Sequence, residues 1–112
     1  ANTYQNYQGE KLQKRFNAFS YWVLSKMFDS HDVGRGRGGV KEALGLVKAN
    51  TLVIGISSDF LFPPVEQEFM AKNIPNATYQ YIESLYGHDG FLIEFEAMTN
   101  TIKKWLKEKV YA

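Results

Sequence analysis

Two residues of the types that serve in acid–base catalysis, Asp59 and His88, each follow a short stretch of β-forming residues. Neighbouring strands of a sheet lie about 4.7–4.9 Å apart. In open parallel sheets, ligands bind beyond the carboxyl ends of the strands, so both side chains would reach the same edge. A carboxylate that holds one imidazole nitrogen leaves the other nitrogen free to act as a general base. The spacing therefore predicts a catalytic pair formed by Asp59 and His88.

A nucleophile to complete such a pair is not apparent in this sequence. The pattern G-x-S-x-G does not occur, and residues 55–59 (GISSD) lack its second glycine. In α/β-hydrolases the chain order is Ser, then Asp or Glu, then His, which would place the missing serine upstream. Without it, Asp59 has a simpler interpretation as the cap of a turn, and His88 as an ordinary loop histidine.

The strands expected to position this pair are residues 51–56 and 78–82. The first is a nearly continuous apolar run, typical of a strand covered on both faces of a parallel sheet. Between them, Pro63 and Pro64 favour the start of a helix that would reach residue 73. This helix is expected to bury three apolar side chains, Val65, Phe69 and Met70.

A loop over residues 85–90 and a helix from Phe91 complete this half of the chain. The final helix carries apolar residues on one stripe, with acidic residues early and basic residues late, as the helix dipole favours. The stripe consists of Phe91, Phe95, Met98, Ile102, Trp105 and Leu106. Strand, helix, strand and helix form a βαβα unit with parallel strands. Two strands alone form a weak sheet, so further strands are expected beside them.

The first half of the sequence predicts helices separated by a loop. Apolar residues recur every three or four positions over residues 10–28, which indicates a helix with one buried face: Leu12, Phe16, Phe19, Val23 and Met27. The helix is expected to break near Asn17, which would cap a second segment. Glycines over residues 34–39 favour a loop. A short helix over residues 40–48 would then bury Ala43, Leu44 and Val47.

Composition narrows the classes of function. The 112 residues carry 13 Lys and Arg against 12 Asp and Glu, and the net charge of +1 gives no long-range attraction for nucleic acid or anionic lipid. There is no cysteine, and no apolar run reaches the length of a membrane span, so a cytoplasmic protein is expected. No metal site is expected, because the histidines lack a metal-binding spacing. Arg35 and Arg37 among glycines offer an alternative as a short RNA-binding tract.

Several stretches of the sequence resemble homoserine O-acetyltransferases, which are acyltransferases with an α/β-hydrolase fold. The resemblance lies in residues 51–63 (TLVIGISSDFLFP) and 86–94 (YGHDGFLIE), which look like the acid and histidine segments of that family. Residues 7–11 with Arg15 and Phe16, and residues 31–36 (HDVGRG), fit the same family.

The resemblance implies a fold class and a set of roles. The chain would be α/β, the C-terminal βαβα portion of an α/β-hydrolase fold (residues 49–112), preceded by a helical lid segment and Gly/Arg loop (residues 1–48). Asp59 would be the triad acid, His88 the general base, and Asp89 a ligand for the amino group of homoserine. An upstream serine would carry the acyl group from acetyl-CoA to L-homoserine, in a step towards methionine, without a bound cofactor.

The resemblance implies a dimer and an inactive fragment, and other functions stay open beside it. The lid pairs subunits in this family, which implies a homodimer, and a chain without the serine would be inactive alone. Fold alone leaves open an esterase, or a serine or homoserine succinyltransferase. Besides these enzymes and the RNA-binding tract, the chain could be a non-catalytic module that self-associates through exposed strand edges. Asp89 has a simpler interpretation as a loop-capping residue.

Overall fold

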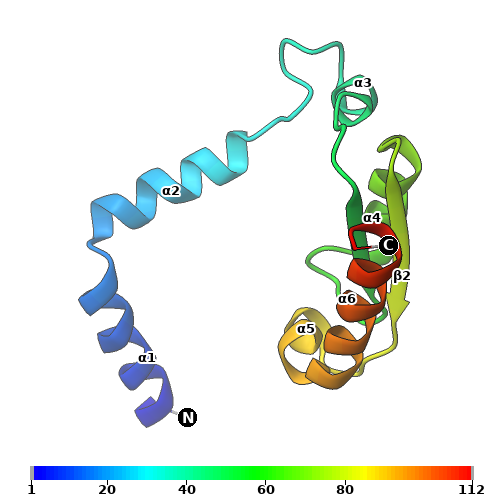
Figure 1. Ribbon diagram of the computed structural model, residues 1–112. Coiled ribbons are helices and arrows are strands. Elements are labelled where there is room, and N and C mark those ends of the chain that lie inside the picture. Colours follow the sequence, from blue (N-terminus) through cyan, green and yellow to red (C-terminus); the bar gives the residue numbers. More distant parts are fainter. Residues whose placement is uncertain (1, 112) are drawn as a thin grey trace. The chain divides into compact units, whose positions relative to one another are not determined.

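The chain forms two compact units, which the computed structural model describes over residues 2–111. The first unit, up to Asp32, contains helices α1 (Asn2–Arg15) and α2 (Ala18–Ser30). The second unit starts at Val33 and holds both strands and the remaining helices (Figure 1). Helices together with a parallel sheet confirm the α/β class.

The first unit is a pair of helices with a capped break between them. The Asn17 side chain accepts a hydrogen bond from the Ser20 backbone N–H at 2.7 Å, which satisfies a free donor of the first turn of α2. This confirms the predicted break. The helical region begins at Asn2 rather than at residue 10, because polar residues in a helix leave no apolar period to detect.

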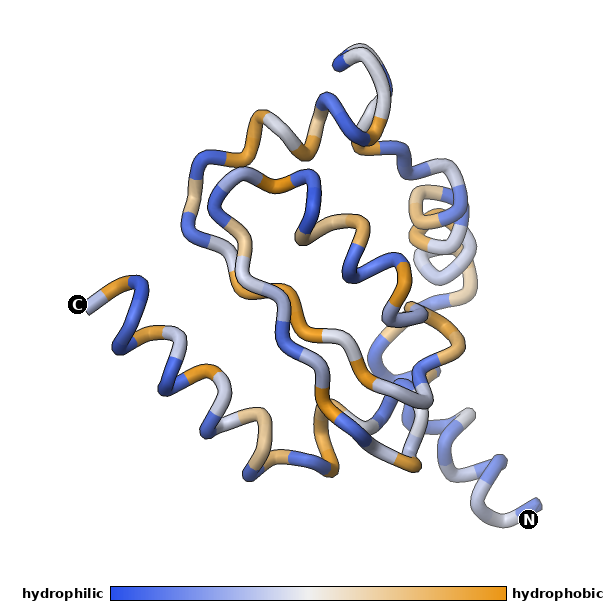
Figure 2. The backbone as a smooth tube through the Cα atoms, turned by 90° about the vertical axis from the view of Figure 1, so that its right-hand side faces the viewer, coloured by the Kyte–Doolittle hydropathy of each residue, from blue (hydrophilic) through white to orange (hydrophobic). Residues whose placement is uncertain are grey.

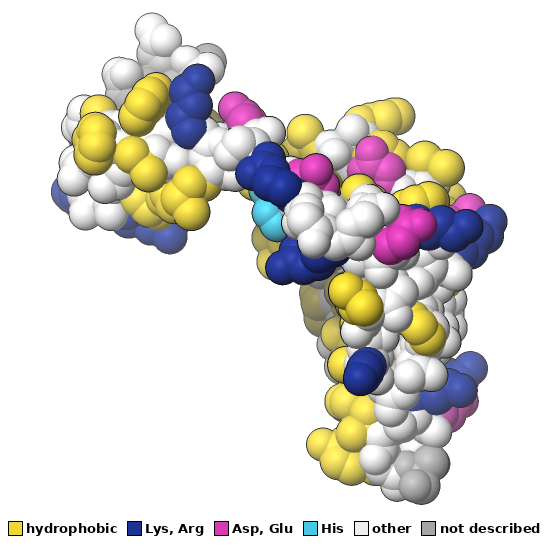
Figure 3. Space-filling model, turned by 90° about the horizontal axis from the view of Figure 1, so that it is seen from above, with side chains coloured by type: hydrophobic (Ala, Val, Ile, Leu, Met, Phe, Trp, Pro, Cys, Tyr) yellow, Lys and Arg dark blue, Asp and Glu magenta, His cyan; other side chains and the backbone are white. Residues whose placement is uncertain are grey.

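The apolar side chains of the first unit are not buried. Neither α1 nor α2 contains a buried residue, and Phe19 and Met27 are 72% and 61% exposed. Hydrophobic side chains are accordingly visible on the surface of this unit (Figure 3). The prediction of a buried face was wrong within this unit, since two consecutive helices provide no third element to cover it.

The second unit is built on two parallel strands. Strands β1 (Thr51–Ile56) and β2 (Ala77–Ile82) pair in register from Thr51 opposite Ala77 to Ile56 opposite Ile82. Helix α3 (Val40–Gly45) precedes the sheet, and α4 (Pro64–Asn73) connects the strands. After β2 come a 3₁₀ turn η1 (Gly87–Asp89), α5 (Gly90–Ile93) and α6 (Phe95–Lys109).

Helices α4 and α6 cover opposite faces of the sheet (Figure 2). Consecutive residues of a strand point to opposite faces. Tyr79 lines a hollow with Ala71 and Lys72 of α4, whereas the next residue, Gln80, lines one with Trp105 of α6. Each face of this small sheet is therefore contacted by one helix.

The core of this unit is small. Its buried apolar residues lie mainly in the strands and in α3, and the predicted burial of Ala43 and Leu44 is confirmed. Val65 and Phe69 of α4 are 70% and 45% exposed, so their predicted burial was wrong in this unit. The complete set of buried apolar side chains among the described residues is Ala43, Leu44, Val53, Ile56, Ile74 and Ile82.

Some element boundaries differ from those expected. Helix α3 ends at Gly45 instead of residue 48, which fits the low helix propensity of glycine, and β2 starts one residue earlier, at Ala77. The last helix is divided at Glu94, whose ψ of 46° is not helical. Its apolar stripe is only partly covered, since Phe95 is 71% exposed and Trp105 is half-buried.

Candidate active site

The carboxylate of Asp59 is fixed by the backbone immediately after β1. Its Oδ1 atom accepts hydrogen bonds from the N–H groups of Leu61 and Phe62, at 3.0 and 2.9 Å. The residue is only 6% exposed. The Phe62 N–H and, to a lesser degree, the contact with His88 lower the pKa of Asp59, while burial opposes this shift. Asp59 is therefore held as a carboxylate.

The imidazole of His88 meets the other oxygen of the same carboxylate. Nδ1 of His88 lies 3.0 Å from Oδ2 of Asp59, so the predicted contact between the two side chains is present. The His88 side chain remains 39% exposed. When Nδ1–H donates to the carboxylate, the lone pair of Nε2 is free to accept a proton. The arrangement suits a general base.

Two aromatic rings flank the imidazole. The ring of Phe62 lies 5.2 Å from the His88 ring, and the ring of Phe91 lies 5.4 Å from it, both tilted. These separations are typical of favourable aromatic contacts. Phe62 lies in the loop between β1 and α4 (residues 57–63, the acid loop), and Phe91 lies in α5, so elements on both sides restrict the orientation of His88.

A cavity of about 370 Å³ opens beside the pair. Asp59 and His88 are its ionisable residues, and apart from Gln67 the rest of its lining is apolar. The apolar side chains come from β1, α4, α5, α6 and the acid loop: Ile54, Ile56, Phe62, Met70, Phe91 and Met98. An apolar lining around a few polar groups is typical of small-molecule sites.

Asp89 lies next to the pair in the chain, at the end of η1. Its side chain is exposed, and within residues 2–111 its carboxylate has no hydrogen-bonding or ion-pair partner. An exposed carboxylate can bind a cationic group, but Asp89 is not among the residues that line the cavity beside the pair. Its role towards an amino group stays a prediction.

Two serines that the sequence did not single out join the acid loop to the segment between β2 and α5 (residues 83–89, the histidine loop). Ser57 Oγ donates to the Ser84 carbonyl and accepts from the Ser84 N–H, both at 2.9 Å. Ser58 Oγ accepts from the Gly87 N–H at 2.8 Å. Their position directly before Asp59 was the only signal in the sequence, and it did not reveal their partners.

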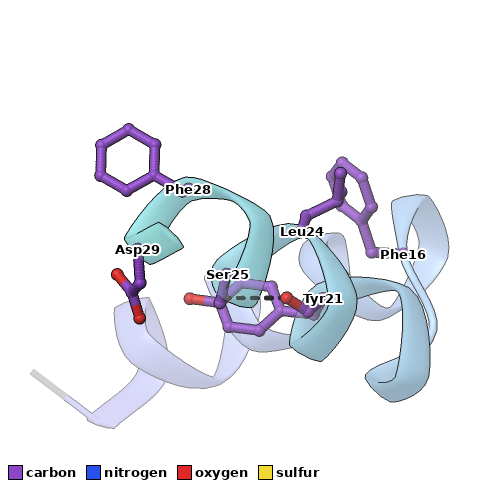
Figure 4. A pocket seen from close by; sticks show the side chains of 6 residues that line it. All are labelled: Phe16, Tyr21, Leu24, Ser25, Phe28 and Asp29. Carbon is purple, nitrogen blue, oxygen red and sulfur yellow. Dashed lines mark hydrogen bonds between the residues drawn. The ribbon is translucent and has the colours of Figure 1, made fainter. Parts of the chain in front are cut away.

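The first unit offers a pocket of a different kind, formed by α2 and by Phe16, the residue that follows α1. It is lined by Phe16, Tyr21, Leu24, Ser25, Phe28 and Asp29 (Figure 4). Ser25 Oγ donates to the Tyr21 carbonyl one helical turn earlier, at 2.8 Å. No histidine lines this pocket, so it lacks the acid–base pair found in the second unit.

The glycine- and arginine-containing loop is compact. The Arg37 side chain donates from Nη1 to the Val33 carbonyl at 2.8 Å, and the Arg37 backbone N–H donates to the Gly34 carbonyl at 3.0 Å. Gly36 and Gly38 adopt φ values of 72° and 87°, which glycine tolerates best. The Arg37 guanidinium thus contacts its own loop, which favours a structural role, and the RNA-binding alternative stays a prediction.

The described part of the chain shows neither a metal-binding cluster nor a membrane-spanning helix. Among residues 2–111, no three His, Cys, Asp or Glu side chains are grouped to hold a metal ion. None of the helices in this range is both long and apolar enough to cross a membrane.

Similarity to known proteins extends over almost the whole chain, although no protein-family model matches it. A homoserine O-acetyltransferase of Cyclobacterium marinum is 50% identical over 107 residues, which is 96% of this chain and 30% of the relative. The homoserine O-acetyltransferase of Thermobifida fusca is 48% identical over 95% of this chain and 28% of its own length. That of Thermus thermophilus is 49% identical over 93% of this chain and 27% of its own length. The chain is related to homoserine O-acetyltransferases.

This relationship confirms the resemblance drawn from the acid and histidine segments. The chain spans about 30% of the length of these homoserine O-acetyltransferases. It therefore corresponds to a part of such an enzyme, and the Asp59–His88 pair lies within that part. The names of the relatives describe acyltransferases that act on homoserine.

Proposed function

We propose that a longer protein containing this chain transfers an acetyl group from acetyl-CoA to the hydroxyl of L-homoserine, with Asp59 and His88 as acid and base. The observation that carries this proposal is the 3.0 Å contact between the buried Asp59 carboxylate and the half-exposed His88 imidazole. It occurs in a chain that is 50% identical to a homoserine O-acetyltransferase. An acyltransferase with a catalytic triad needs such a pair.

In the first half-reaction, His88 activates an upstream serine. Nε2 removes the proton of the serine hydroxyl while the serine oxygen attacks the thioester carbon of acetyl-CoA. The tetrahedral intermediate collapses, the C–S bond breaks, and the imidazolium returns the proton to the thiolate of CoA. The products are free CoA and an acetyl-serine ester. Asp59 stabilises the imidazolium that forms during this step.

In the second half-reaction, homoserine replaces the thiol. Nε2 of His88 removes the proton of the homoserine hydroxyl, and the resulting oxygen attacks the acetyl-serine carbonyl. The bond to the serine oxygen breaks, and the imidazolium returns the proton to that oxygen. The product is O-acetylhomoserine, and the enzyme regains its starting state. No cofactor other than the acyl donor enters either step.

Asp89 is proposed to bind the amino group of homoserine. Its exposed carboxylate directly follows His88 in the chain and lacks a partner within the described range. An ion pair with an ammonium group would hold the homoserine hydroxyl near the base. A hydrogen bond to a charged group contributes about 1.5–3 kcal/mol. Replacing Asp89 should therefore raise the KM for homoserine more than it lowers kcat.

The proposal extends to the fold around this site and to the oligomeric state. Residues 49–112 would form the C-terminal βαβα part of an α/β-hydrolase core, and residues 1–48 a helical lid. The exposed aromatic side chains of α2, such as Phe19 and Trp22, support a role of this helix in pairing subunits of a cytoplasmic homodimer. Size-exclusion chromatography that gives a monomer at every concentration would contradict the dimer.

The test of the reaction is release of free CoA from acetyl-CoA, with and without L-homoserine. The full-length enzyme is compared with this 112-residue chain, which contains no G-x-S-x-G sequence. We expect homoserine-dependent release by the full-length enzyme and none by the chain alone. Succinyl-CoA and L-serine serve as matched alternative substrates.

Three other outcomes would change the assignment. Faster release with succinyl-CoA or with L-serine would keep the triad and change the substrate. Cleavage of simple esters without any CoA release would leave a hydrolase and refute the acyltransferase. Release by the chain alone would show that it does not depend on an upstream serine.

A further inference from the structure

The contact between Asp59 and His88 depends on how two loops are held together beyond the end of the sheet. The register of β1 and β2 ends with Ile56 opposite Ile82. One more backbone bond follows, from the Ser57 N–H to the Ile82 carbonyl at 3.0 Å. Past this point, serine side chains provide the bonds between the two loops.

Ser57 continues the strand pairing with its side chain. Its hydroxyl donates to the Ser84 carbonyl and accepts from the Ser84 N–H, both at 2.9 Å. A single hydroxyl thus satisfies both backbone groups of Ser84, which is only 6% exposed. Leaving these buried groups without partners would be costly. The start of the histidine loop is therefore fastened to the acid loop.

Ser58 holds the residue that immediately precedes His88. Its Oγ accepts a hydrogen bond from the Gly87 N–H at 2.8 Å. Gly87 has a φ of 62°, in the left-handed region that favours glycine, and so turns the chain sharply into His88. The hydrogen bond to the Gly87 N–H restrains the peptide group before Gly87, and a rotation of this peptide would move the His88 imidazole away from Asp59.

The other end of the histidine loop is held by close packing. A Cβ atom added at Gly90 would lie 2.8 Å from both Ile56 Cγ2 and Ser84 Oγ. Only a residue without a side chain fits there. The loop from Ser84 to Gly90 is thus fixed on both sides of His88.

From this arrangement we infer that Ser57 and Ser58 are positioning residues, which hold His88 in reach of Asp59 by fastening the histidine loop to the acid loop. Three consecutive residues, 57, 58 and 59, bond to residues 84, 87 and 88 in turn. This inference rests on the proposed function, since it assigns a role within the same site. Neither serine touches the reacting atoms; each acts through His88.

The test compares variants of the full-length enzyme. Ser58→Ala removes the acceptor for the Gly87 N–H, Ser57→Ala removes the link to Ser84, and Ser58→Thr keeps the hydroxyl. The matched control is Thr51→Val, because the Thr51 hydroxyl donates to the Ala49 carbonyl at 2.9 Å at the opposite end of β1. For each variant, kcat, KM and thermal unfolding are measured.

We expect Ser58→Ala to lower kcat about 10- to 100-fold, as a displacement of about 1 Å does. KM should change little, because the loss concerns the transition state rather than substrate binding. Ser58→Thr should restore most of kcat, and Thr51→Val should match the unmodified enzyme. The resonance of the His88 Nδ1–H proton should broaden or disappear in Ser58→Ala and stay in Thr51→Val.

Several results would overturn the inference. One is a folded Ser58→Ala variant with an unchanged kcat and an unchanged His88 proton resonance. Another is a loss in Ser58→Ala that Ser58→Thr does not restore. If Ser58→Ala does not fold, the same measurements on Ser57→Ala test the inference. If neither serine variant folds while Thr51→Val does, the two serines maintain the fold rather than the Asp59–His88 contact, and the inference is overturned. An unmodified enzyme without CoA release refutes the proposed function instead, and the proton resonance then tests the serines by itself.

Discussion

The two compact units of the chain contain hydrophobic residues of similar kinds but use them differently. In the first unit, α2 exposes Phe19, Trp22 and Phe28 by more than half of their surface. In the second unit, Ile56 and Ile82 are 5% and 6% exposed, and the ends of their strands carry the acid–base pair. An amphipathic helix needs a surface to cover, whereas two paired strands between helices already make a small core. On this basis we propose that the chemistry lies in the self-packed unit and that α2 takes part in association.

The largest effect that would sharpen this comparison is the contrast between the two histidines. His88→Ala in the full-length enzyme should lower kcat by about 10⁴- to 10⁶-fold, because it removes the proton acceptor of both half-reactions. His31→Ala, in the first unit, is the matched control and should change kcat little, since His31 is exposed at the end of α2. Steady-state CoA release measures both. Equal losses in the two variants would contradict a site confined to the second unit.

Asp59→Asn should have the next largest effect. The amide keeps the shape of the side chain but removes the charge that stabilises the imidazolium and sets the tautomer, so kcat should fall by about 10³- to 10⁴-fold. Circular dichroism checks that the variant is folded. As a control, Asp29→Asn changes an aspartate that lines the pocket of the first unit and should retain far more activity. A fall of less than about tenfold in Asp59→Asn would remove Asp59 from the triad.

Much of the acid–base pair could be predicted from local sequence, and much of the packing could not. The run from Thr51 to Ile56 indicated a strand, and the positions of Asp59 and His88 after two strands predicted their contact. Burial of Phe19 was predicted from helical periodicity, and burial of Val65 from the helix expected after Pro63 and Pro64. Both were wrong, since a local pattern shows where a helix and its apolar face lie and not whether a neighbour covers them.

The bonds made by Ser57 and Ser58 were beyond prediction for a different reason. Their partners lie 27 and 29 residues away in the chain, so no local pattern links them. Serine is common in turns, where it bonds to nearby backbone, and this makes it a weak signal for a tertiary contact. Asn17 is the opposite case, since its partner Ser20 lies one helical turn away and the cap could be read directly.

A third prediction compares the stability of the two units. Ile82→Ala should lower the free energy of unfolding by about 2–5 kcal/mol, because Ile82 is buried and its removal leaves a cavity. Trp22→Ala should change it by less than about 0.5 kcal/mol in the chain alone, since Trp22 is 56% exposed. Urea unfolding of this chain measures both. A large loss for Trp22→Ala that persists when the chain is diluted would show that α2 is covered within a single copy of the chain, and would break the comparison.

The smallest expected effect is a pH dependence of stability that arises from Asp59. Its folded-state pKa is lowered from 3.8, chiefly by the backbone N–H of Phe62, so the ionised form stabilises the fold. This contribution is fully present above about pH 4 and is lost as the pH falls through the lower folded-state pKa. The difference in unfolding free energy between the unmodified chain and Asp59→Asn should therefore shrink on acidification. A constant difference for Asp59→Asn would mean that its carboxylate is not held by the Phe62 N–H and His88.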